Sequence, residues 1–404
     1  MTIAAVIAEY NPFHNGHAFQ LAALRRQVGE NGAVVVVMSP DFVQRGEPAC
    51  LEKRLRAQAA LEHGADLVVE LPLPYAMASA ERFAFGGVAL CEAMGCVDLL
   101  CFGSEAGQLE PLDRLARLLE DPALEEPLRR QLAQGRTFAQ ARQRALEELA
   151  GADTAALLSQ PNNTLGVEYL RQLHRLGSAI QPMTLPREGA GHHDGPSGRF
   201  ASASSLRRLW NEGGAEALAP YVPERALPLY AAAQQQGQRA QLALGERCVL
   251  SGLRQKLAAL EAGSLPLPDC SEGIENRLAK AVRSACSLEE LAFAVKSKRY
   301  TLARVRRLIF SAWLEVPLEL FRQTPPYLRI LGMGPGGAAV LRRMKETASL
   351  PFGTSLAQLG RTSPQAAAFA ALESRAADQW SLFCPQPRPC GLDYTLPAVY
   401  PHKR

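Results

Sequence analysis

Short apolar runs alternate with helical patterns over the first third of the chain, and this alternation constrains the fold most. Stretches of helical periodicity separate four runs that are rich in apolar or β-branched residues, namely Ile3–Ala8, Ala33–Met38, Asp66–Glu70 and Asp98–Phe102. Continuous apolar strands joined by helices form a parallel sheet that is buried on both faces. The sequence therefore predicts a doubly wound, Rossmann-like α/β domain whose ligands bind at the carboxyl ends of the strands.

Helical patterns fill the intervals between these strands. They begin at about His17, at about Glu52 and at Ala80, and a further helix is expected over Asn162–Leu176. A fifth strand is expected over Ala179–Leu185. The α/β alternation is therefore predicted to continue to about residue 185.

The length of the chain points to two domains. Its 404 residues exceed what one hydrophobic core usually contains. Beyond about Pro220 strand signals nearly vanish, and leucine- and alanine-rich helical patterns replace them. We therefore expect an α/β domain over residues 1–220 and a mostly helical domain over residues 221–404.

Composition excludes several classes of protein. Hydrophobic residues make up 47% and charged residues 21%, which is typical of a globular chain rather than a disordered one. No apolar run reaches about 18 residues, so no membrane span is expected, and the N-terminus lacks the basic lead of a signal peptide. Nine cysteines without a CxxC pair argue against a disulfide framework and a zinc ribbon. A cytoplasmic protein is therefore expected.

Positive charge is concentrated in one segment. Between Lys296 and Lys345 there are eleven lysines and arginines but only two acids, so this segment carries +9 in a chain whose net charge is +4. A local excess of this size fits a polyanionic partner, and it fits a solvated helical surface equally well.

The strongest chemical signal is the segment Asn11–His17, NPFHNGH, directly after the first strand. Gly16 removes a side chain where backbone can approach a ligand, and the following helix offers free N–H groups to an anion. His14 and His17 can donate hydrogen bonds to phosphate oxygens and stabilise charge that develops on them. Each histidine can instead cap or pack, and a metal site is disfavoured because no third ligand stands at a recognised spacing. The position at a strand-to-helix crossover favours phosphate.

A second signal is the serine-rich helix start ASASSLR, residues 201–207. Its hydroxyls can cap the helix or bind phosphate, and Arg207 adds a planar cation. A plain N-cap beside a surface arginine is the alternative for either residue alone. Together with HxGH, the segment resembles the ISSTxIR motif of the HIGH-motif nucleotidyltransferase superfamily, with Ser204 at the usual threonine position. Members of that superfamily attack the α-phosphate of ATP, form an adenylate and release pyrophosphate.

The chain resembles one family of that superfamily more closely, the tRNA(Met) cytidine acetate ligases. The matching stretches span both expected domains; they are AEYNPFHNGH (8–17), VQRGEPA (43–49), GADLVVELP (64–72), FGSE (102–105), PNNTLGVEYL (161–170), REGAGHHD (187–194) and KSKRYTLARVRRLIF (296–310). The resemblance implies an enzyme that activates acetate with ATP as acetyl-adenylate. It then transfers acetyl to N4 of the wobble cytidine of elongator tRNA(Met).

The resemblance also implies the residues of the site. Catalysis is assigned to His14, His17, Ser204 and Arg207. ATP is held by the strand–loop–helix segment Ile7, Ala8, Glu9, Tyr10, Asn11, Pro12, Phe13, His14, Asn15, Gly16, His17, Ala18, Phe19 and Gln20, and further by Gly103, by Asn162 or Asn163, and by Arg187.

Elementary chemistry supports several of these assignments. Gly103 ends the fourth strand, where a nucleotide would lie. Asn162 and Asn163 open a helix, so either amide can bind a ribose or base edge, or cap that helix. Arg187 opens a loop with four glycines that can close over a substrate and exclude water from a reactive adenylate. Within that loop His192 and His193 can assist binding or simply be exposed.

Further basic residues follow the second strand. Arg45, in the segment QRGE at the ligand edge, can contact phosphate or RNA. Lys53, Arg54 and Arg56 lie on the next expected helix, and a solvated face is preferred for at least one of them.

A basic stripe is expected in the helical domain. Spacings of i, i+4, i+8 and i+11 place four residues on one helical face, namely Lys296, Tyr300, Arg304 and Arg307. The opposite face faces the core with Leu302, Val305, Ile309 and Trp313. A basic face with an aromatic residue suits an RNA backbone and one stacked base, and the resemblance extends the tRNA contact to Lys298 and Arg299.

The segment Gly332–Gly337 fits the pattern GxGxxG but is not interpreted as a dinucleotide site. No acidic residue stands about 20 positions on, and no βαβ unit surrounds the segment. A tight turn is expected, one that can pass near RNA phosphates beside Arg329, Arg342 and Arg343.

The resulting hypothesis is a ligase with two half-reactions. Acetate attacks the α-phosphate of ATP, with Mg²⁺ accompanying the nucleotide, and the cytidine amine then attacks the acetyl carbon. The sequence offers no convincing general base, positioning alone can suffice for the amine, and no cysteine is needed. Two alternatives stay open: an adenylyltransferase that joins ATP to a small phosphate ester, and a non-catalytic tRNA-binding protein gated by ATP. Acetate selectivity cannot be derived from the sequence, and the choice of tRNA rests on the resemblance alone.

Overall fold

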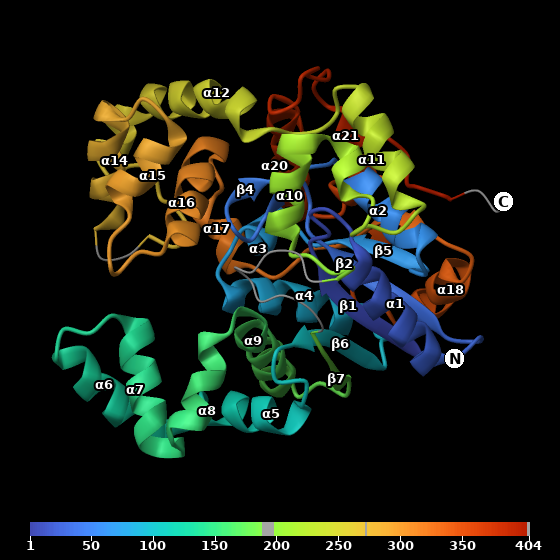
Figure 1. The fold of residues 1–404 in the computed structure, drawn as a ribbon, viewed down its shortest axis with the longest axis horizontal. Coiled ribbons are helices and arrows are strands. Elements are labelled where there is room, and N and C mark those ends of the chain that lie inside the picture. The colour runs from blue at the N-terminus through green and yellow to red at the C-terminus, as the bar shows by residue number, and fades with distance from the viewer. Residues whose placement is uncertain (188–197, 271–272, 402–404) are drawn as a thin grey trace.

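The fold is built around one mostly parallel sheet, shown in Figure 1. The structure is a computed structural model that describes residues 1–187, 198–270 and 273–401. Within these residues the sheet has seven strands in the order β7 (Gln181–Pro186), β6 (Leu99–Ser104), β1 (Ile3–Ala8), β2 (Ala33–Met38), β5 (Leu67–Glu70), β8 (Leu328–Met333) and β9 (Phe352–Gly353). A short antiparallel hairpin of β3 (Phe42–Val43) and β4 (Glu47–Pro48) follows β2.

The strand predictions are confirmed along the parallel part of the sheet. β1 and β2 have the expected bounds, and β5, β6 and β7 differ from them by one or two residues at their ends. β1 lies parallel to both β2 and β6, β2 is parallel to β5, and β6 is parallel to β7. After β5 the chain returns to the centre of the sheet, where β6 pairs with β1. The crevice at the carboxyl ends of β1 and β6 is therefore the topological switch point of a doubly wound α/β fold.

Both faces of the sheet are covered by helices, as the continuous apolar strands require. Alternate residues of β1 belong to two buried clusters, with Ala4 and Val6 in one and Ala5 and Ile7 in the other. The first cluster contains residues of α1 (Asn15–Val28) and α2 (Lys53–Glu62). The second contains residues of α4 (Ala80–Met94) and α9 (Pro161–Leu176). The helices expected at about His17, Glu52, Ala80 and Asn162 are thus α1, α2, α4 and α9.

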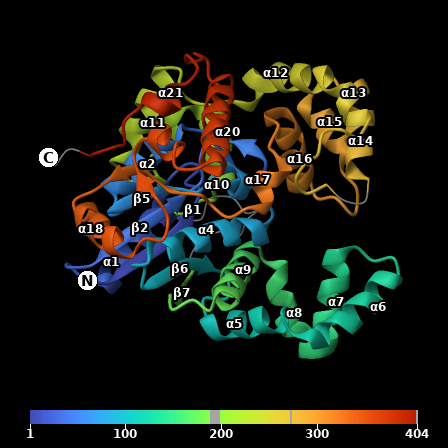
Figure 2. The ribbon, with the colours of Figure 1, turned by 180° about the vertical axis from the view of Figure 1, so that it is seen from behind.

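Two groups of helices project from one side of the sheet, one above the other, in Figure 1 and again from behind in Figure 2. The lower arm comprises α5 (Leu109–Leu118), α6 (Glu125–Ala133), α7 (Phe138–Ala150) and α8 (Ala152–Ala156). The upper arm comprises α12 (Leu242–Gln255), α13 (Leu257–Glu261), α14 (Ile274–Ser284), α15 (Leu288–Val295) and α16 (Leu302–Leu314). No helix within the described residues is long and apolar enough to cross a membrane.

The remaining helices surround the sheet. They are α3 (Leu73–Ala76), α10 (Ala203–Gly213), α11 (Ala226–Gln235), α17 (Leu318–Arg322), α18 (Gly337–Thr347), α19 (Leu356–Leu359), α20 (Pro364–Ser381) and α21 (Leu392–Thr395). One buried cluster runs from the sheet through Phe42 into α16 and α20, where its rings meet those of Phe310, Trp313 and Phe383. The upper arm thus shares its core with the sheet, and the boundary at residue 220 stays a prediction.

Two strands come from the part of the chain where strand signals nearly vanish. β8 lies antiparallel to β5, and β9 pairs with β8. The tight turn expected at Gly332–Gly337 connects β8 to α18, and its Gly334 and Gly336 N–H groups donate to the Asp66 backbone oxygen (2.8 Å) and to Asp66 Oδ1 (3.0 Å). The turn packs against the start of β5. The placement of Arg329 beside RNA phosphates is wrong, because this side chain is only 1% exposed.

Lys53 and Arg56 of α2 are buried, and Arg54 is partly exposed but held in ion pairs, so the solvated face expected for at least one of them is wrong. Lys53 is 0% exposed, and its Nζ lies 2.6 Å from a carboxylate oxygen of Glu70 and 2.8 Å from one of Asp393. Arg54 also reaches Asp393, at 3.0 Å, and Arg329 binds both Asp393 and Glu70. The carboxylates from β5 and α21 compensate the buried cations. The network ties α2, β5, β8 and α21 together.

Candidate active site

The HxGH segment lies at the switch point of the sheet, directly after β1. His14 is the N-cap of α1, and its Nδ1 accepts a hydrogen bond from the Gly16 N–H at 3.1 Å. The His14 N–H in turn donates to Nδ1 of His17 at 3.2 Å, and the two rings stack with centroids 3.7 Å apart. Because both Nδ1 atoms accept, each neutral ring carries its proton on Nε2. Capping thus occupies one nitrogen of each histidine and leaves one N–H donor.

Burial keeps both rings neutral. It lowers the pKa of His14 to about 3, and the nearby Arg187 cation lowers it further. Burial also lowers the pKa of His17 well below its ordinary value, with His14 and Arg187 as the next causes. At neutral pH the two histidines therefore offer neutral hydrogen-bond donors, while Arg187 supplies the positive charge. This combination suits the oxygens of a phosphate group.

A second set of residues approaches the same crevice from β6, α9 and the end of β7. Gly103 lies in β6 against Arg187, and a Cβ added to it would stand 3.3 Å from Cγ of Arg187. Arg187 Nη1 donates to Oδ1 of Asn162 at 2.9 Å, and the charge of Arg187 also reaches His14 and His17. The structure therefore brings Gly103, Asn162 and Arg187 together beside the histidines. The Gly-rich loop beyond Arg187, with His192 and His193, lies outside the described residues.

The two asparagines of α9 have different surroundings. Asn163 is completely buried; its Oδ1 accepts from the Ala106 N–H at 3.0 Å, and its Nδ2 donates to Gln160 at 2.7 Å. Asn162 donates from Nδ2 to Glu105 at 2.6 Å, and its Oδ1 faces Arg187. Asn163 therefore fixes the loop after β6, and Asn162 is the asparagine beside the crevice.

The start of α10 docks onto the turn after β1. Ser202 caps α10, so Ser204 is not needed as its cap, and Ser204 Oγ accepts instead from Nη1 of Arg45 at 3.1 Å. Arg207 is no plain surface residue, because its Nη1 donates to the Asn11 backbone oxygen at 2.8 Å and its Nη2 pairs with Glu47 at 2.5 Å. The two motifs that are far apart in the sequence therefore meet at one site.

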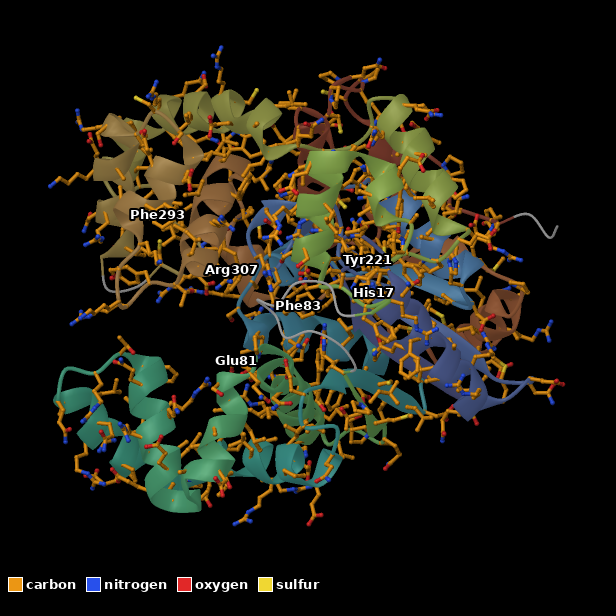
Figure 3. The ribbon with its side chains drawn as sticks, in the orientation of Figure 1. His17, Glu81, Phe83, Tyr221, Phe293 and Arg307 are labelled. Carbon is orange, nitrogen blue, oxygen red and sulfur yellow. The ribbon has the colours of Figure 1, made fainter. Side chains whose placement is uncertain are left out.

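Several residues of the segment 7–20 shape the turn through packing. Phe13 is 0% exposed and its backbone oxygen accepts from the Tyr230 hydroxyl at 2.7 Å, while Asn11 Oδ1 accepts from the Cys50 N–H at 2.8 Å. Asn15 donates to the backbone oxygens of Arg199 and Pro220. The Tyr221 backbone oxygen accepts from the Asn15 N–H at 2.9 Å, and Figure 3 labels Tyr221 and His17 in this region. These contacts hold the turn in the geometry that aligns the histidines.

Sequence reasoning named Glu9 only as a member of this segment and did not single it out. Its Oε1 accepts from the Gln44 N–H at 2.8 Å, so the residue after β1 is joined to the residue after β3. Burial raises the pKa of Glu9, while the charges of Arg207 and Arg45 oppose the rise. The signal that could have identified it is its position, because a carboxyl group directly after the first strand lies at the ligand edge.

The expected basic stripe is wrong in its geometry. α16 begins at Leu302, so Lys296, Lys298, Arg299 and Tyr300 precede it and share no helical face with Arg304 and Arg307. Tyr300 is 4% exposed, and its ring lies 5.3 Å from the guanidinium carbon of Arg304. The predicted core face of α16 is confirmed for Val305, Ile309 and Trp313 and is partly buried at Leu302.

Arg307 connects the upper arm to the site. Its Nε lies 3.3 Å from Oδ2 of Asp269, and its Nη1 donates to the Gln44 backbone oxygen at 3.2 Å. In the view of Figure 3 it stands between Phe293, on the upper arm, and His17. Lys296 places its Nζ 5.4 Å from the ring centre of Phe293, which is 52% exposed.

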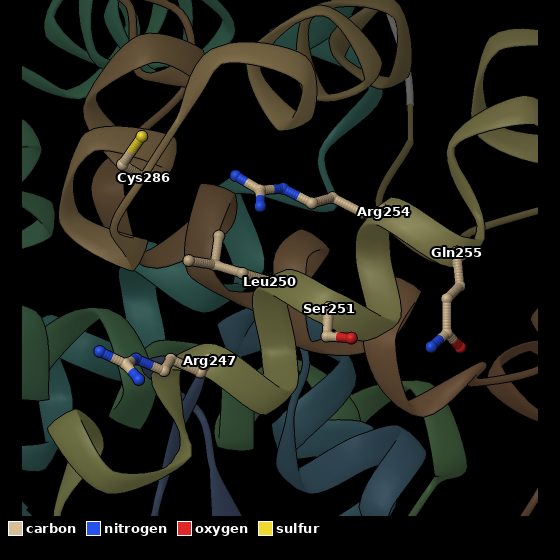
Figure 4. A pocket seen from close by; sticks show the side chains of 6 residues that line it. All are labelled: Arg247, Leu250, Ser251, Arg254, Gln255 and Cys286. Atoms are coloured by element: carbon tan, nitrogen blue, oxygen red, sulfur yellow. The ribbon is translucent and has the colours of Figure 1, made fainter.

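Two other features bear on ligands. An open groove of about 670 Å³ runs along α12, away from the strand ends; its lining residues, shown in Figure 4, are Arg247, Leu250, Ser251, Arg254, Gln255 and Cys286. Within the described residues, no three histidine, cysteine or acidic side chains gather closely enough to hold a metal ion. The described part of the crevice therefore has no protein metal cage, and its histidine and arginine donors are suited to a phosphate group.

The fold and this site define a nucleotidyltransferase of the HIGH class, and the family model described as HIGH nucleotidyl transferase matches residues 1–391. A tRNA(Met) cytidine acetate ligase of Syntrophotalea carbinolica is 40% identical over 95% of each chain, and one of Caldanaerobacter subterraneus subsp. tengcongensis is 38% identical over 89% of this chain and 90% of its own. The chain belongs to the tRNA(Met) cytidine acetate ligase family.

Solved structures agree with this assignment. A crystal structure of Thermotoga maritima TmcAL bound with alpha-thio ATP is 32% identical, covers 99% of both chains and superposes with a TM-score of 0.91. The apo form of the same protein gives a TM-score of 0.92. The predicted fold class and the expected family are thereby confirmed.

Proposed function

We propose that the chain forms acetyl-adenylate from acetate and ATP and transfers the acetyl group to N4 of the wobble cytidine of elongator tRNA(Met). The observation that carries the proposal is the pair of neutral Nε2–H donors of His14 and His17 at the switch point of the sheet. Relatives named for this activity, aligned over most of their length, support the choice of acetate and tRNA.

In the first half-reaction an acetate oxygen attacks the α-phosphorus of ATP, and pyrophosphate leaves. His14 and His17 donate Nε2–H bonds to phosphate oxygens as charge develops on them, and Arg187 neutralises part of that charge. Gly103 leaves room beside Arg187 for the nucleotide, and Asn162 orients the guanidinium. Ser204 and Arg207 receive the departing pyrophosphate. The other members of the segment Ile7–Gln20 shape the turn around ATP.

Magnesium enters this proposal as part of the Mg·ATP substrate. The crevice contains Glu9 and Glu47 but no cluster of three potential ligands among the described residues. Because Mg²⁺ usually keeps several waters and binds through substrate phosphates, it needs no such cage. The chain's own contribution is to bind and orient the nucleotide.

In the second half-reaction the cytidine amine attacks the acetyl carbon, and AMP leaves. The tRNA backbone is bound by the upper arm through the basic residues around the start of α16, which are Lys296, Lys298, Arg299, Arg304 and Arg307, with Tyr300 packed among them. Arg307 brings this surface to the edge of the crevice. The proposal thus gives residues 1–220 the chemistry and residues 221–404 the tRNA.

Mass spectrometry of nucleosides tests the proposal directly. Elongator tRNA(Met) incubated with the protein, ATP and isotope-labelled acetate is expected to carry labelled N4-acetylcytidine, and a transcript with uridine at the wobble position is the control. Pyrophosphate release should require acetate. Release with a small phosphate ester but not with acetate would show an adenylyltransferase, and tRNA binding without pyrophosphate release would show a non-catalytic binder.

A further inference from the structure

The acetyl transfer leaves a proton to be removed, and the histidines of the crevice are unsuited to accept it. Attack by the cytidine N4 amine on the acetyl carbon places positive charge on nitrogen, which a base relieves by taking the proton. In His14 and His17, Nδ1 already accepts a hydrogen bond and Nε2 carries a proton, and burial lowers the pKa of both rings. They donate hydrogen bonds and do not take up protons near neutral pH.

The other carboxylates near the strand ends are already engaged. Glu105 accepts hydrogen bonds from the Asn162 N–H, from Asn162 Nδ2 and from the Asn163 N–H. Glu47 pairs with Arg207 at 2.5 Å. Asp41 accepts from the Lys53 N–H and faces the Lys53 ammonium at 3.6 Å. Glu105 and Glu47 are thus held by hydrogen-bond donors or by a cation, and Asp41, whose pKa burial raises, is only 1% exposed and so is closed to a substrate.

Glu9 differs from them. Its Oε1 accepts from the Gln44 N–H at 2.8 Å, whereas its Oε2 has no hydrogen-bond or ion-pair partner within the described residues. It is half-buried, directly after β1 at the ligand edge. The charged and titratable groups that face it come from the hairpin, α10, α2 and α9, namely Arg45, Glu47, Arg207, Arg56 and Tyr169. Burial raises the pKa of Glu9 despite the arginines, which suits a base that works near neutral pH.

The hydrogen bond from Gln44 also links Glu9 to the upper arm. Gln44 donates its N–H to Glu9, and its backbone oxygen accepts from Nη1 of Arg307 on α16. Gly46, two residues on, has φ +69°, and a Cβ there would stand 2.3 Å from the Arg307 backbone nitrogen. The hairpin is thus clamped between α16 and Glu9. Glu9 therefore lies at the part of the crevice edge that α16 contacts through this hairpin.

We propose that Glu9 is the general base of acetyl transfer and accepts the N4 proton of the cytidine on Oε2. In this step the bond between N4 and the acetyl carbon forms, and the bond between that carbon and the AMP oxygen breaks. The electron pair of the broken bond goes to the AMP phosphate, and the N4 proton goes to Glu9, which later releases it to water. This inference rests on the proposed function and adds the group that completes its second half-reaction.

Glu9→Gln separates the two half-reactions, because the amide oxygen can still accept from the Gln44 N–H while the base is lost. Acetate-dependent exchange of pyrophosphate into ATP reports adenylation, and single-turnover formation of N4-acetylcytidine from preformed enzyme-bound acetyl-adenylate reports transfer. The fall in transfer should exceed any fall in exchange by about 10²–10⁴-fold. Glu47→Gln removes a negative charge beside the same arginines and is the matched control; because its partner Arg207 acts in adenylation, its transfer rate should fall no further than its exchange rate.

The pH dependence of the native protein provides a second measurement. Transfer should decline as pH falls through the raised pKa of Glu9, and Glu9→Asp should keep part of the rate and the same decline, which Glu9→Gln should lack. Equal losses of exchange and transfer in Glu9→Gln, an unchanged transfer rate, or an equal effect of Glu47→Gln would overturn the assignment of Glu9 alone. A native protein without acetate-dependent exchange would instead refute the proposed function, and this inference with it.

Discussion

Replacing His14 by asparagine separates the two tasks that the structure gives this residue. As the N-cap of α1, His14 accepts the Gly16 N–H through Nδ1, and asparagine is among the best N-cap acceptors. Asparagine at this position has no equivalent of the Nε2–H that faces the phosphate site in the proposed mechanism. His14→Asn should therefore keep the helix start and lose one transition-state donor, whereas His14→Ala should lose both.

The magnitudes of the two effects differ enough to be told apart. Removal of one preorganised donor to a developing anion typically lowers the rate by about 10²–10³-fold. Loss of an N-cap costs about 1 kcal/mol of stability. We expect both variants to lose about 10²–10³-fold in acetate-dependent exchange of pyrophosphate into ATP. Only His14→Ala should also lose about 1 kcal/mol in the free energy of unfolding, measured by urea denaturation.

Thr137→Ala is the matched control, because Thr137 forms the same kind of capping box at α7, in the lower arm. It should lower stability by a similar amount and leave exchange unchanged. Exchange within about threefold of the native rate in His14→Asn would show that Nε2 contributes nothing. The histidine would then be a helix cap alone, and the phosphate assignment of the turn would be wrong.

Four further predictions concern the pKa of His14, the buried network of Asp393, Arg187 and the hairpin. Because the pKa of His14 is lowered to about 3, the unfolded chain binds a proton below about pH 6.5 that the folded chain does not bind until about pH 3. The free energy of unfolding should therefore fall by about 2 kcal/mol between pH 7.5 and pH 5. Urea unfolding of the native protein and of His14→Asn with the same pH dependence in this window would contradict the prediction. Asp393→Asn breaks the buried network and should cost about 3–5 kcal/mol in urea unfolding, whereas Glu126→Gln, in an exposed ion pair, should cost less than about 1 kcal/mol. Arg187→Gln should lower kcat/KM for ATP in the exchange assay by about 10–100-fold, the value of one or two charged hydrogen bonds, and an unchanged value would remove Arg187 from the site. Gly46→Ala should displace α16 and reduce acetyl transfer more than pyrophosphate exchange. Transfer and exchange rates equal to those of the native protein would argue against the contact between the hairpin and α16.

The parallel sheet could be predicted because its signal is local. Each strand is a continuous apolar run, so that the bounds of β1 and β2 can be read directly from the residues. β8 gives no such signal, since its residues LRILGM include a charged side chain. Arg329 is tolerated there because Glu70 and Asp393, far away in the sequence, neutralise it. The missed strand and the misjudged arginine therefore have the same cause, a compensation that only the tertiary structure creates.

The candidate site was predictable to a similar extent. HxGH and the serine-rich helix start are short motifs, and the structure brings them together through Arg207 and the Asn11 backbone oxygen. The choice between Asn162 and Asn163 could not be made from the sequence, because adjacent helical residues point about 100° apart and either direction was open. The basic stripe failed for a related reason: helical spacing has meaning only inside a helix, and Thr301 caps α16 five residues after Lys296.

In the proposed mechanism, the placement of Gln44 connects the two half-reactions. Its two backbone groups bind Glu9 on one side and Arg307 on the other. In that mechanism a tRNA that moves the upper arm should also move this hairpin, because the Gly46 backbone fits against that of Arg307 without room for a side chain. Interactions that are made only when tRNA is bound would thus adjust the position of Glu9, while the histidines are fixed by their own capping bonds. In the proposed mechanism, adenylation should therefore proceed without tRNA, whereas acetyl transfer should depend on the contact between the upper arm and the hairpin.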